Sequence, residues 1–192
     1  MTLSPLPVVL DACVLVDACL RDTLLRLAET PPQYLPCWSA AILDEVGRTL
    51  INKLGRTEAQ WAHLQHKMTE AFPDARVAGF EHLIPSLTNQ VKDRHVLAAA
   101  IKAGAAVIVT YNLKDFRCGD LQPWSVEAIS PDAFLTVCLD ADPQTVIAKL
   151  GLQAADSGRP FAALLERLGR ARVGGFIGQV TAAMNRQGLP LI

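Results

Sequence analysis

Short apolar segments alternate with amphipathic segments along most of this chain, and that alternation limits the possible folds more than any other feature. Residues 8–10 and 105–110 are apolar runs with the length of buried strands. Residues 34–38, 75–79 and 126–129 are weaker strand candidates. The segments between them repeat their apolar residues at helical spacing. Strands that alternate with helices form a parallel sheet between two layers of helices. The sequence therefore predicts an α/β fold of three layers, α/β/α, around a central parallel sheet.

Helix boundaries can be read from capping residues. Ser39, Thr57 and Ser130 each precede a helical pattern and have side chains suited to an N-cap. Gly55 and Gly104 follow such patterns, where a helix commonly ends. The expected helices lie at 13–28, 40–54, 58–72, 93–103 and 132–139. Pro36 predicts that the strand at 34–38 is an edge or irregular strand, because proline has no N–H to donate.

The last quarter of the chain has no strand signal. Helical patterns cover residues 145–155, 161–168 and 176–187. We therefore expect an α/β domain at residues 1–141 and a helical C-terminal extension at 142–192.

Composition restricts the kind of protein. The formal net charge is -1, so bulk charge cannot hold this chain on nucleic acid, and such a role would need local basic patches or a metal. Five dispersed cysteines without a Cys-x-x-Cys pair indicate free thiols in a reducing compartment. The N-terminus has no basic segment followed by a long apolar one, and no apolar run reaches membrane-spanning length. These features predict a cytoplasmic protein without a membrane segment.

Acidic residues recur at strand ends and helix starts. Asp11 ends the first strand, Asp115 follows the strand at 105–110, and Asp93 begins a helix. Parallel α/β sheets bind their ligands at the carboxyl ends of strands, so these positions favour a common site. Asp11 and Asp93 could instead be helix caps. Asp44 and Glu45 lie on a nearby helix, and helical spacing does not decide between them or exclude a solvated pair.

Clustered carboxylates without histidine or cysteine at ligand spacing favour Mg²⁺ or Mn²⁺. Such a metal site can activate water against a phosphodiester bond. His63 and His66 are three residues apart on a helix, and we expect them to be surface residues rather than zinc ligands.

Four motifs occur in the order typical of one family. They are Val-Leu-Asp11-Ala-Cys-Val-Leu, Trp-Ser39-Ala-Ala-Ile-Leu-Asp-Glu45-Val, Lys-Asp93-Arg-His-Val-Leu-Ala-Ala-Ala and Val-Ile-Val-Thr110-Tyr-Asn112-Leu-Lys-Asp115-Phe. Together they span about residues 7–139 and resemble the PIN-domain nucleases, particularly the VapC-type ribonuclease toxins.

The resemblance implies specific roles. Asp11, Glu45 and Asp93 match the first three metal-binding acidic positions of the family, and the match selects Glu45 over Asp44. The chain departs from the family at two positions: Cys13 replaces the usual Asn, Ser or Thr, and Asn112 stands where a fourth acidic residue often lies. Asp115 is then expected to take the fourth position. The residues expected to support these carboxylates by hydrogen bonds are Cys13, Ser39, Thr110 and Asn112.

The resemblance also implies a function and partners. It predicts an endoribonuclease that uses Mg²⁺ or Mn²⁺, acts as the toxin of a toxin–antitoxin pair, binds a cognate antitoxin and forms a homodimer. RNA would be held by basic residues near the site, first of all Arg94 and Lys114. Further candidates are Arg48, Lys53, Lys92 and Arg117.

Two alternatives remain at this stage. One is a catalytically impaired PIN fold that only binds a partner, with Cys13 and Asn112 as signs of lost activity. The other is a phosphatase of the haloacid dehalogenase type, which also begins with an Asp at a strand end. That phosphatase needs a second Asp two residues later, and Cys13 stands there.

Overall fold

The computed structural model describes residues 5–186, which pack as two compact units. The first unit comprises residues 5–16 and 34–129, and the second comprises residues 17–33 and 130–186. The segment 17–33 thus belongs with the C-terminal helices although it lies early in the sequence. This division differs from the expected domain boundary at residue 141. That boundary stays a prediction.

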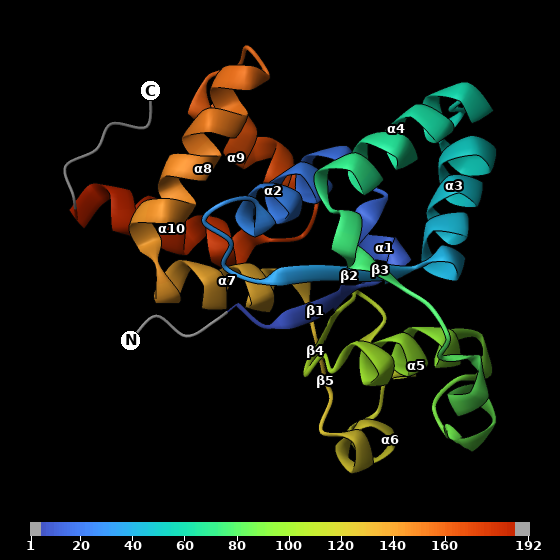
Figure 1. Ribbon diagram of the computed structural model, residues 1–192. Helices are drawn as coiled ribbons and strands as arrows, with labels where there is room; N and C mark the ends of the chain where they lie inside the picture. The colour runs from blue at the N-terminus through green and yellow to red at the C-terminus, as the bar shows by residue number, and fades with distance from the viewer. Residues whose placement is uncertain (1–4, 187–192) are drawn as a thin grey trace. The chain divides into compact units, whose positions relative to one another are not determined.

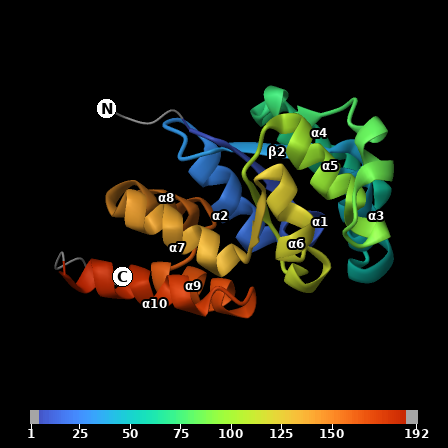
Figure 2. The same cartoon turned by 90° about the horizontal axis from the view of Figure 1, so that it is seen from below.

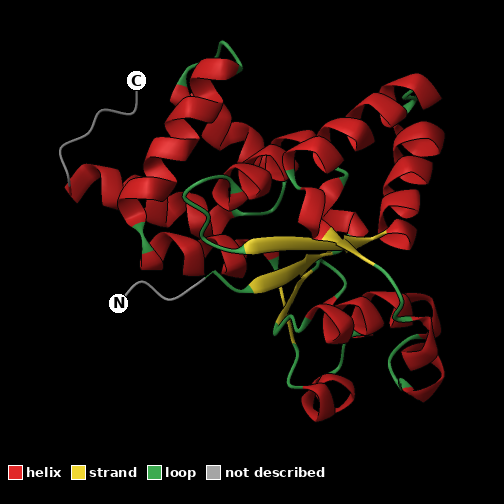
Figure 3. Ribbon diagram, in the orientation of Figure 1, coloured by secondary structure: helices red, strands yellow, loops and turns green. Residues whose placement is uncertain are grey.

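A five-stranded parallel sheet is the centre of the first unit (Figure 3). The strand order is β3-β2-β1-β4-β5, and every neighbouring pair is parallel. The strands are β1 (Pro7–Leu10), β2 (Leu35–Ser39), β3 (Arg76–Val77), β4 (Val107–Val109) and β5 (Glu127–Ile129). This arrangement confirms the predicted α/β class with a central parallel sheet.

Apolar side chains explain why β1 and β4 lie in the middle. Val9 and Leu10 are fully buried, as are Ile108 and Val109. In register, Val9 pairs with Ile108 and Leu10 with Val109. The N–H of Asp11 then donates to the Val109 carbonyl at 3.1 Å, so the pairing continues one residue beyond β1.

Helices cover both faces of this sheet. Figure 1 shows α3 (Ala40–Leu54) and α5 (Arg94–Ala103) on opposite sides of β1 and β2. The residues of α5 at 96–100 are almost completely buried, so this part of the helix is covered on all sides. The remaining helices and 3₁₀ turns of the unit are α1 (Ala12–Leu15), α4 (Glu58–Ala71), α6 (Cys118–Leu121), η1 (Pro73–Ala75), η2 (Glu81–Ser86), η3 (Val91–Asp93), η4 (Leu113–Asp115) and η5 (Gln122–Trp124).

The expected caps are present. Ser39 Oγ accepts the N–H of Ile42 at 3.2 Å, and Thr57 forms a reciprocal capping box with Gln60. Gly104 ends α5 with a φ of 63°, a left-handed conformation that glycine adopts without a steric penalty.

Two expectations about elements were wrong. The single helix expected at 13–28 is two helices, α1 and α2 (Ala18–Ala28), because the side chain of Asp17 accepts the N–H of Leu20 and starts a new helix. The strand β2 is an inner strand rather than an edge. Pro36 is tolerated there because β3 pairs only with Trp38 and Ser39, further along β2. Helix α4 is present as expected, and Met68 is its single buried residue.

The second unit is entirely helical. It consists of α2, α7 (Pro131–Ala141), α8 (Pro143–Asp156), α9 (Phe161–Arg170) and α10 (Gly174–Arg186), the last four of which appear in orange to red in Figure 2. Buried polar contacts join α2 to α8: Gln153 Nε2 donates to the Cys19 carbonyl at 3.0 Å, and Thr23 Oγ1 donates to Gln153 Oε1 at 2.8 Å. The helix expected at 176–187 is present as α10, although residue 187 lies outside the described range. Over residues 5–186, no helix combines the length and apolar character needed to cross a membrane.

Candidate functional site

The candidate site lies where the strand order reverses. From β1 the chain continues to β2 and β3 on one side, whereas β4 and β5 lie on the other. Ligands of such sheets bind outside the carboxyl ends of the strands at this point. Asp11 follows β1 and Thr110 follows β4, and Thr110 Oγ1 donates to Asp11 Oδ2 at 2.6 Å.

Both oxygens of the buried Asp11 carboxylate accept hydrogen bonds. Oδ1 accepts the N–H of Ala12 at 2.7 Å, which caps α1. Oδ2 accepts the Thr110 hydroxyl and the Cys13 thiol, the latter at 3.2 Å. Asp11 is therefore a helix cap and also faces the cavity described below, so the two interpretations of this residue are compatible. Three donors fix the orientation of the carboxylate.

Cys13 remains a thiol in this setting. Burial, and then the charge of Asp11, raise its pKa to about 12. A protonated thiol can donate to Asp11, and its sulfur also accepts the N–H of Tyr111 at 3.3 Å. The residue thus makes the kind of hydrogen bond to Asp11 that a serine would make, through a weaker donor.

A cavity of about 370 Å³ brings together three of the four predicted carboxylates. Asp11, Glu45 and Asp93 line it, with Cys13 and Asn112. Asn112 also donates its N–H to Thr110 Oγ1 at 3.0 Å. The other polar or charged residues of the lining are Thr49, Lys53 and Lys92.

Glu45 projects from α3 towards His95 of α5. Its Oε1 lies 3.0 Å from His95 Nε2. This contact with His95 lowers the pKa of Glu45 against the opposing effect of burial, and the charges of Arg48 and Lys92 lower it further. Glu45 is therefore held ionised. Asp44, the alternative in the sequence, does not line this cavity.

Asp93 and Asp115 share one lysine. Lys92 Nζ lies 2.9 Å from Asp115 Oδ2 and 3.4 Å from Asp93 Oδ2. Burial raises the pKa of Asp93, and the charges of Asp11 and Asp115 add to this while Lys92 opposes it. Asp93 Oδ2 is buried and has no hydrogen-bond partner in the described structure. The Lys92 ammonium is thus the cation nearest to this oxygen, and it only partly offsets the effect of burial.

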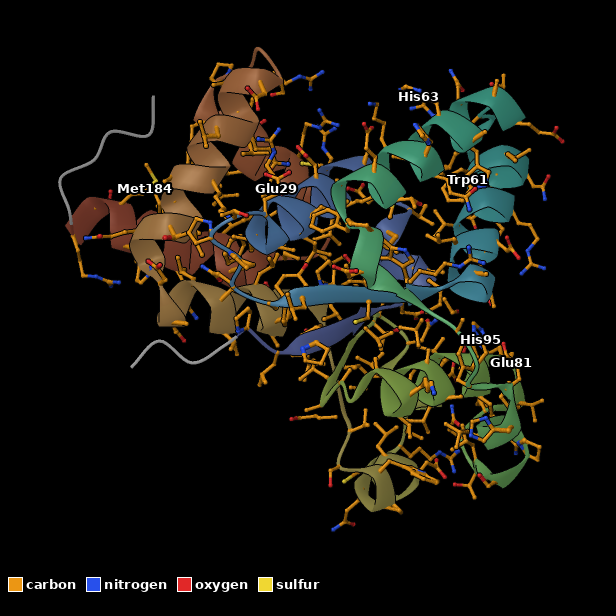
Figure 4. All side chains as sticks on the ribbon, viewed as in Figure 1. Glu29, Trp61, His63, Glu81, His95 and Met184 are labelled. Atoms are coloured by element: carbon orange, nitrogen blue, oxygen red, sulfur yellow. The ribbon has the colours of Figure 1, made fainter. Side chains whose placement is uncertain are left out.

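The other predicted residues have varied positions. Asp115 lines a neighbouring cavity together with Arg94 and Lys114, rather than the cavity of Asp11. Ser39 is fully buried, and its hydroxyl caps α3. His63 and His66 are exposed on α4, and Figure 4 shows His63 on the outer side of that helix.

Two residues had no signal in the sequence: His95, which contacts Glu45 of the first cavity, and Asn89, which lines the second. The contact of His95 with Glu45 joins two helices from opposite faces of the sheet, and no local spacing relates the two residues. Asn89 lines the cavity of Asp115 and lies in an irregular segment without a motif.

The donor set fits a hard divalent cation. Among residues 5–186, no three His, Cys, Asp or Glu side chains are grouped closely enough to hold a metal by themselves. Mg²⁺ does not require such a cage, because it keeps several waters and binds through one or two carboxylates. Asp93 Oδ2, a buried oxygen without a hydrogen bond, is the donor that such a cation would satisfy.

Comparisons with known proteins agree with this picture. The sequence model of the PIN domain family matches residues 7–114. A protein of Mycobacterium tuberculosis (strain ATCC 25618 / H37Rv) named "Putative ribonuclease VapC50" is 35% identical over 142 residues, covering 70% of this chain and 82% of that protein. No solved structure matches the chain. The family match and this relative confirm the resemblance inferred from the four motifs.

Proposed function

Since this chain belongs to the PIN-domain family, we propose that it is an endoribonuclease that hydrolyses RNA phosphodiester bonds with Mg²⁺ or Mn²⁺. The observation that carries the proposal is the convergence of Asp11, Glu45 and Asp93 on one cavity at the carboxyl ends of β1 and β4. The name of the VapC50 relative supports ribonuclease activity.

In this proposal Asp11, Glu45 and Asp93 hold the metal, and Asp115 or Asn112 supplies the fourth position. A bound divalent cation lowers the pKa of a water and offsets charge at the phosphate. Thr110, Cys13 and the N–H of Ala12 orient the carboxylate of Asp11. His95 lies against Glu45 and lowers the pKa of its carboxyl.

RNA would be bound by basic side chains beside these carboxylates. Arg94 and Lys114 line the cavity next to Asp115. We expect them to contact phosphates of the substrate. Because the net charge of the chain is close to zero, RNA would have to be attracted by such local positive charge.

The physiological part of the proposal is a toxin paired with an antitoxin, acting as a homodimer in the cytoplasm. The VapC-type relative supports the toxin role. All five cysteines are free, which suits a reducing compartment.

The proposal is tested with Asp11→Asn and Glu45→Gln, assayed for Mn²⁺-dependent cleavage of single-stranded RNA. Loss of a residue that hydrogen-bonds to a metal ligand typically lowers metal affinity or activity by roughly 10–100-fold. Removing a metal ligand itself should lower the cleavage rate by more than that. Asp44→Asn is the matched control, because Asp44 is adjacent to Glu45 in sequence but does not line the cavity, and it should keep the wild-type rate.

Titration calorimetry with Mn²⁺ distinguishes the proposed ribonuclease from a catalytically impaired PIN fold that only binds a partner. If the wild-type protein neither binds Mn²⁺ nor cleaves RNA, that result supports the catalytically impaired, partner-binding fold. Unchanged cleavage by Asp11→Asn would show that the assigned carboxylates do not act as proposed.

A further inference from the structure

A second cavity, of about 250 Å³, is lined by Asp115 but by none of the three carboxylates Asp11, Glu45 and Asp93. This volume holds roughly eight water molecules. One nucleobase has a comparable number of non-hydrogen atoms. The lining of the cavity comes from the segment before α5, from the first turn of α5, and from η4 and α6. None of the roles assigned above explains the cavity as a whole.

Asn89 provides an independent indication of a ligand. The residue is 2% exposed and lines the cavity, and neither Nδ2 nor Oδ1 of its side chain has a hydrogen-bond partner in the described structure. Burying an unpaired amide is unfavourable, so native structures rarely retain one without a reason. The backbone carbonyl of Asn89 accepts Arg94 Nε at 3.1 Å, which ties this segment to α5. An amide offers a donor next to an acceptor, as the edge of a nucleobase does.

The charges of the lining favour an anionic ligand. Arg94, Lys114 and Arg117 are cationic, and within residues 5–186 none of the three forms a salt bridge. The two acidic residues of the lining are already engaged: Asp115 pairs with Lys92, and Asp120 accepts a hydrogen bond from Thr88. Positive charge is therefore left for phosphate oxygens.

An apolar contact completes the lining. Val91 lines the same cavity and is 72% exposed, although it is a β-branched apolar residue. The face of a base could cover it. Single-stranded RNA is recognised through such contacts, because its bases are unstacked and present both their faces and their edges.

We propose that this cavity binds one nucleotide of single-stranded RNA beside the cleaved phosphate, with the Asn89 amide reading the base and with Lys114 and Arg117 holding phosphate. The inference rests on the proposed ribonuclease function and adds the residue that determines sequence preference. Lys92 links the two sites, because its ammonium contacts Asp115 of this cavity and Asp93 of the other.

Asn89→Leu is the decisive variant. Leucine has a similar size and removes an amide that has no partner, so the thermal midpoint should not fall. Cleavage products of a mixed-sequence RNA pool should lose their preference at one position by roughly 5- to 150-fold, the range expected for one bidentate base contact. Retention of the wild-type preference would overturn the assignment of Asn89.

Lys114→Met and Arg117→Met should behave differently. Each should weaken binding of all RNA sequences alike and reduce the slope of log affinity against log salt by about 0.7, the value for one phosphate contact on a single strand. The background for this measurement is Asp11→Asn, read by fluorescence anisotropy of labelled RNA. Lys102→Met is the matched control, because Lys102 is an exposed lysine of α5 that does not line the cavity.

The design separates failure of this inference from failure of the proposed function. Wild-type protein that cleaves RNA while Asn89→Leu keeps its base preference would overturn only the nucleotide site. Absence of metal-dependent cleavage would reject the ribonuclease, yet a base preference in binding that Asn89→Leu abolishes would still support the cavity. Inorganic phosphate could compete equally with RNA for wild type and for Asn89→Leu, with no base preference in either protein. That result would show that the cavity binds only anions, and it would overturn the reading of a base by Asn89.

Discussion

At Gly47 the indole of Trp61 packs directly against the backbone of α3. A Cβ added at Gly47 would lie 2.5 Å from Trp61 Nε1 and 2.7 Å from its Cε2. Figure 4 shows Trp61 between α4 and α3. Because an aromatic ring cannot bend away as a lysine could, a methyl group at this position would have to move the ring or the helix.

We therefore expect Gly47→Ala to lower the free energy of unfolding by about 1–3 kcal/mol, the usual cost of overpacking. Gly151→Ala in α8 is the matched comparison, since a Cβ there meets nothing within 4 Å. It should stabilise the protein by about 0.5–1 kcal/mol, because alanine is the better helix former. Urea unfolding of both variants measures the two effects, and equal shifts for both would contradict the packing argument.

The candidate site shows which residue positions a sequence can indicate. Asp11 was identifiable because it ends an apolar strand, and strand ends meet at one edge of a parallel sheet. Glu45 could be chosen over Asp44 only through the family motif, and the cavity lining agrees with that choice. Asp115 was expected beside Asp11 but lines the neighbouring cavity, since η4 turns its carboxylate to Lys92. His95 and Asn89 depend on contacts between distant segments, which no local pattern encodes.

At the level of elements, α8 begins at a capping aspartate. Asp142 Oδ1 accepts the N–H of Thr145 at 3.0 Å, and hydrogen bonding to Thr145 lowers the pKa of Asp142 below its usual value of 3.8. Because the folded pKa lies below the unfolded one, the ionised carboxylate stabilises the fold above pH 3.8. That contribution is lost as the pH falls through the folded pKa.

Asp142→Ala should thus cost about 1 kcal/mol at neutral pH, as loss of an N-cap does. Asp142→Asn keeps an acceptor for Thr145 and should cost less. The difference between wild type and Asp142→Asn should be constant from neutral pH to about pH 5 and should shrink below that value. Urea midpoints measured across this range provide the test, and a difference that widened on acidification would mean that the sign is wrong.

Capping chemistry also explains where the prediction of elements succeeded. Ser39, Thr57 and Ser130 each stand before a helix as expected. Asp17 carries the same capping signal, but apolar spacing runs on from α1 into α2 and suggests one continuous helix. Periodicity reports which face of a segment is buried, but it does not report where one helix stops and the next begins.

At the scale of the whole molecule, the helix α2 packs with helices from the other end of the chain. Leu20, Leu24 and Leu27 of α2 are buried. Gln153 of α8 bonds to Cys19 and Thr23, and Lys149 Nζ donates to the carbonyls of Arg26, Glu29 and Pro31 at 2.6–3.1 Å. Residues 17–33 therefore depend on helices that lie more than a hundred positions later.

A chain truncated after residue 141 should accordingly lose stability. It lacks α8–α10 and would expose the leucines of α2 to water, at roughly 1.5–3 kcal/mol for each fully buried side chain. Thermal unfolding followed by circular dichroism should show a lower midpoint or a non-cooperative transition. Unfolding at the midpoint of the full chain would instead establish residues 1–141 as an independent domain, as the sequence first suggested.

The hydrogen bond between Thr110 and Asp11 joins residues 99 positions apart, and this distance sets when the site can exist. During synthesis, Asp11 leaves the ribosome long before Glu45 and Asp93, and the residues of β4 emerge after all three. No shorter nascent chain holds the complete set of carboxylates with the hydroxyl that orients Asp11. If the chain cleaves RNA, the nascent polypeptide is therefore inactive beside its own message until Thr110 has left the ribosome.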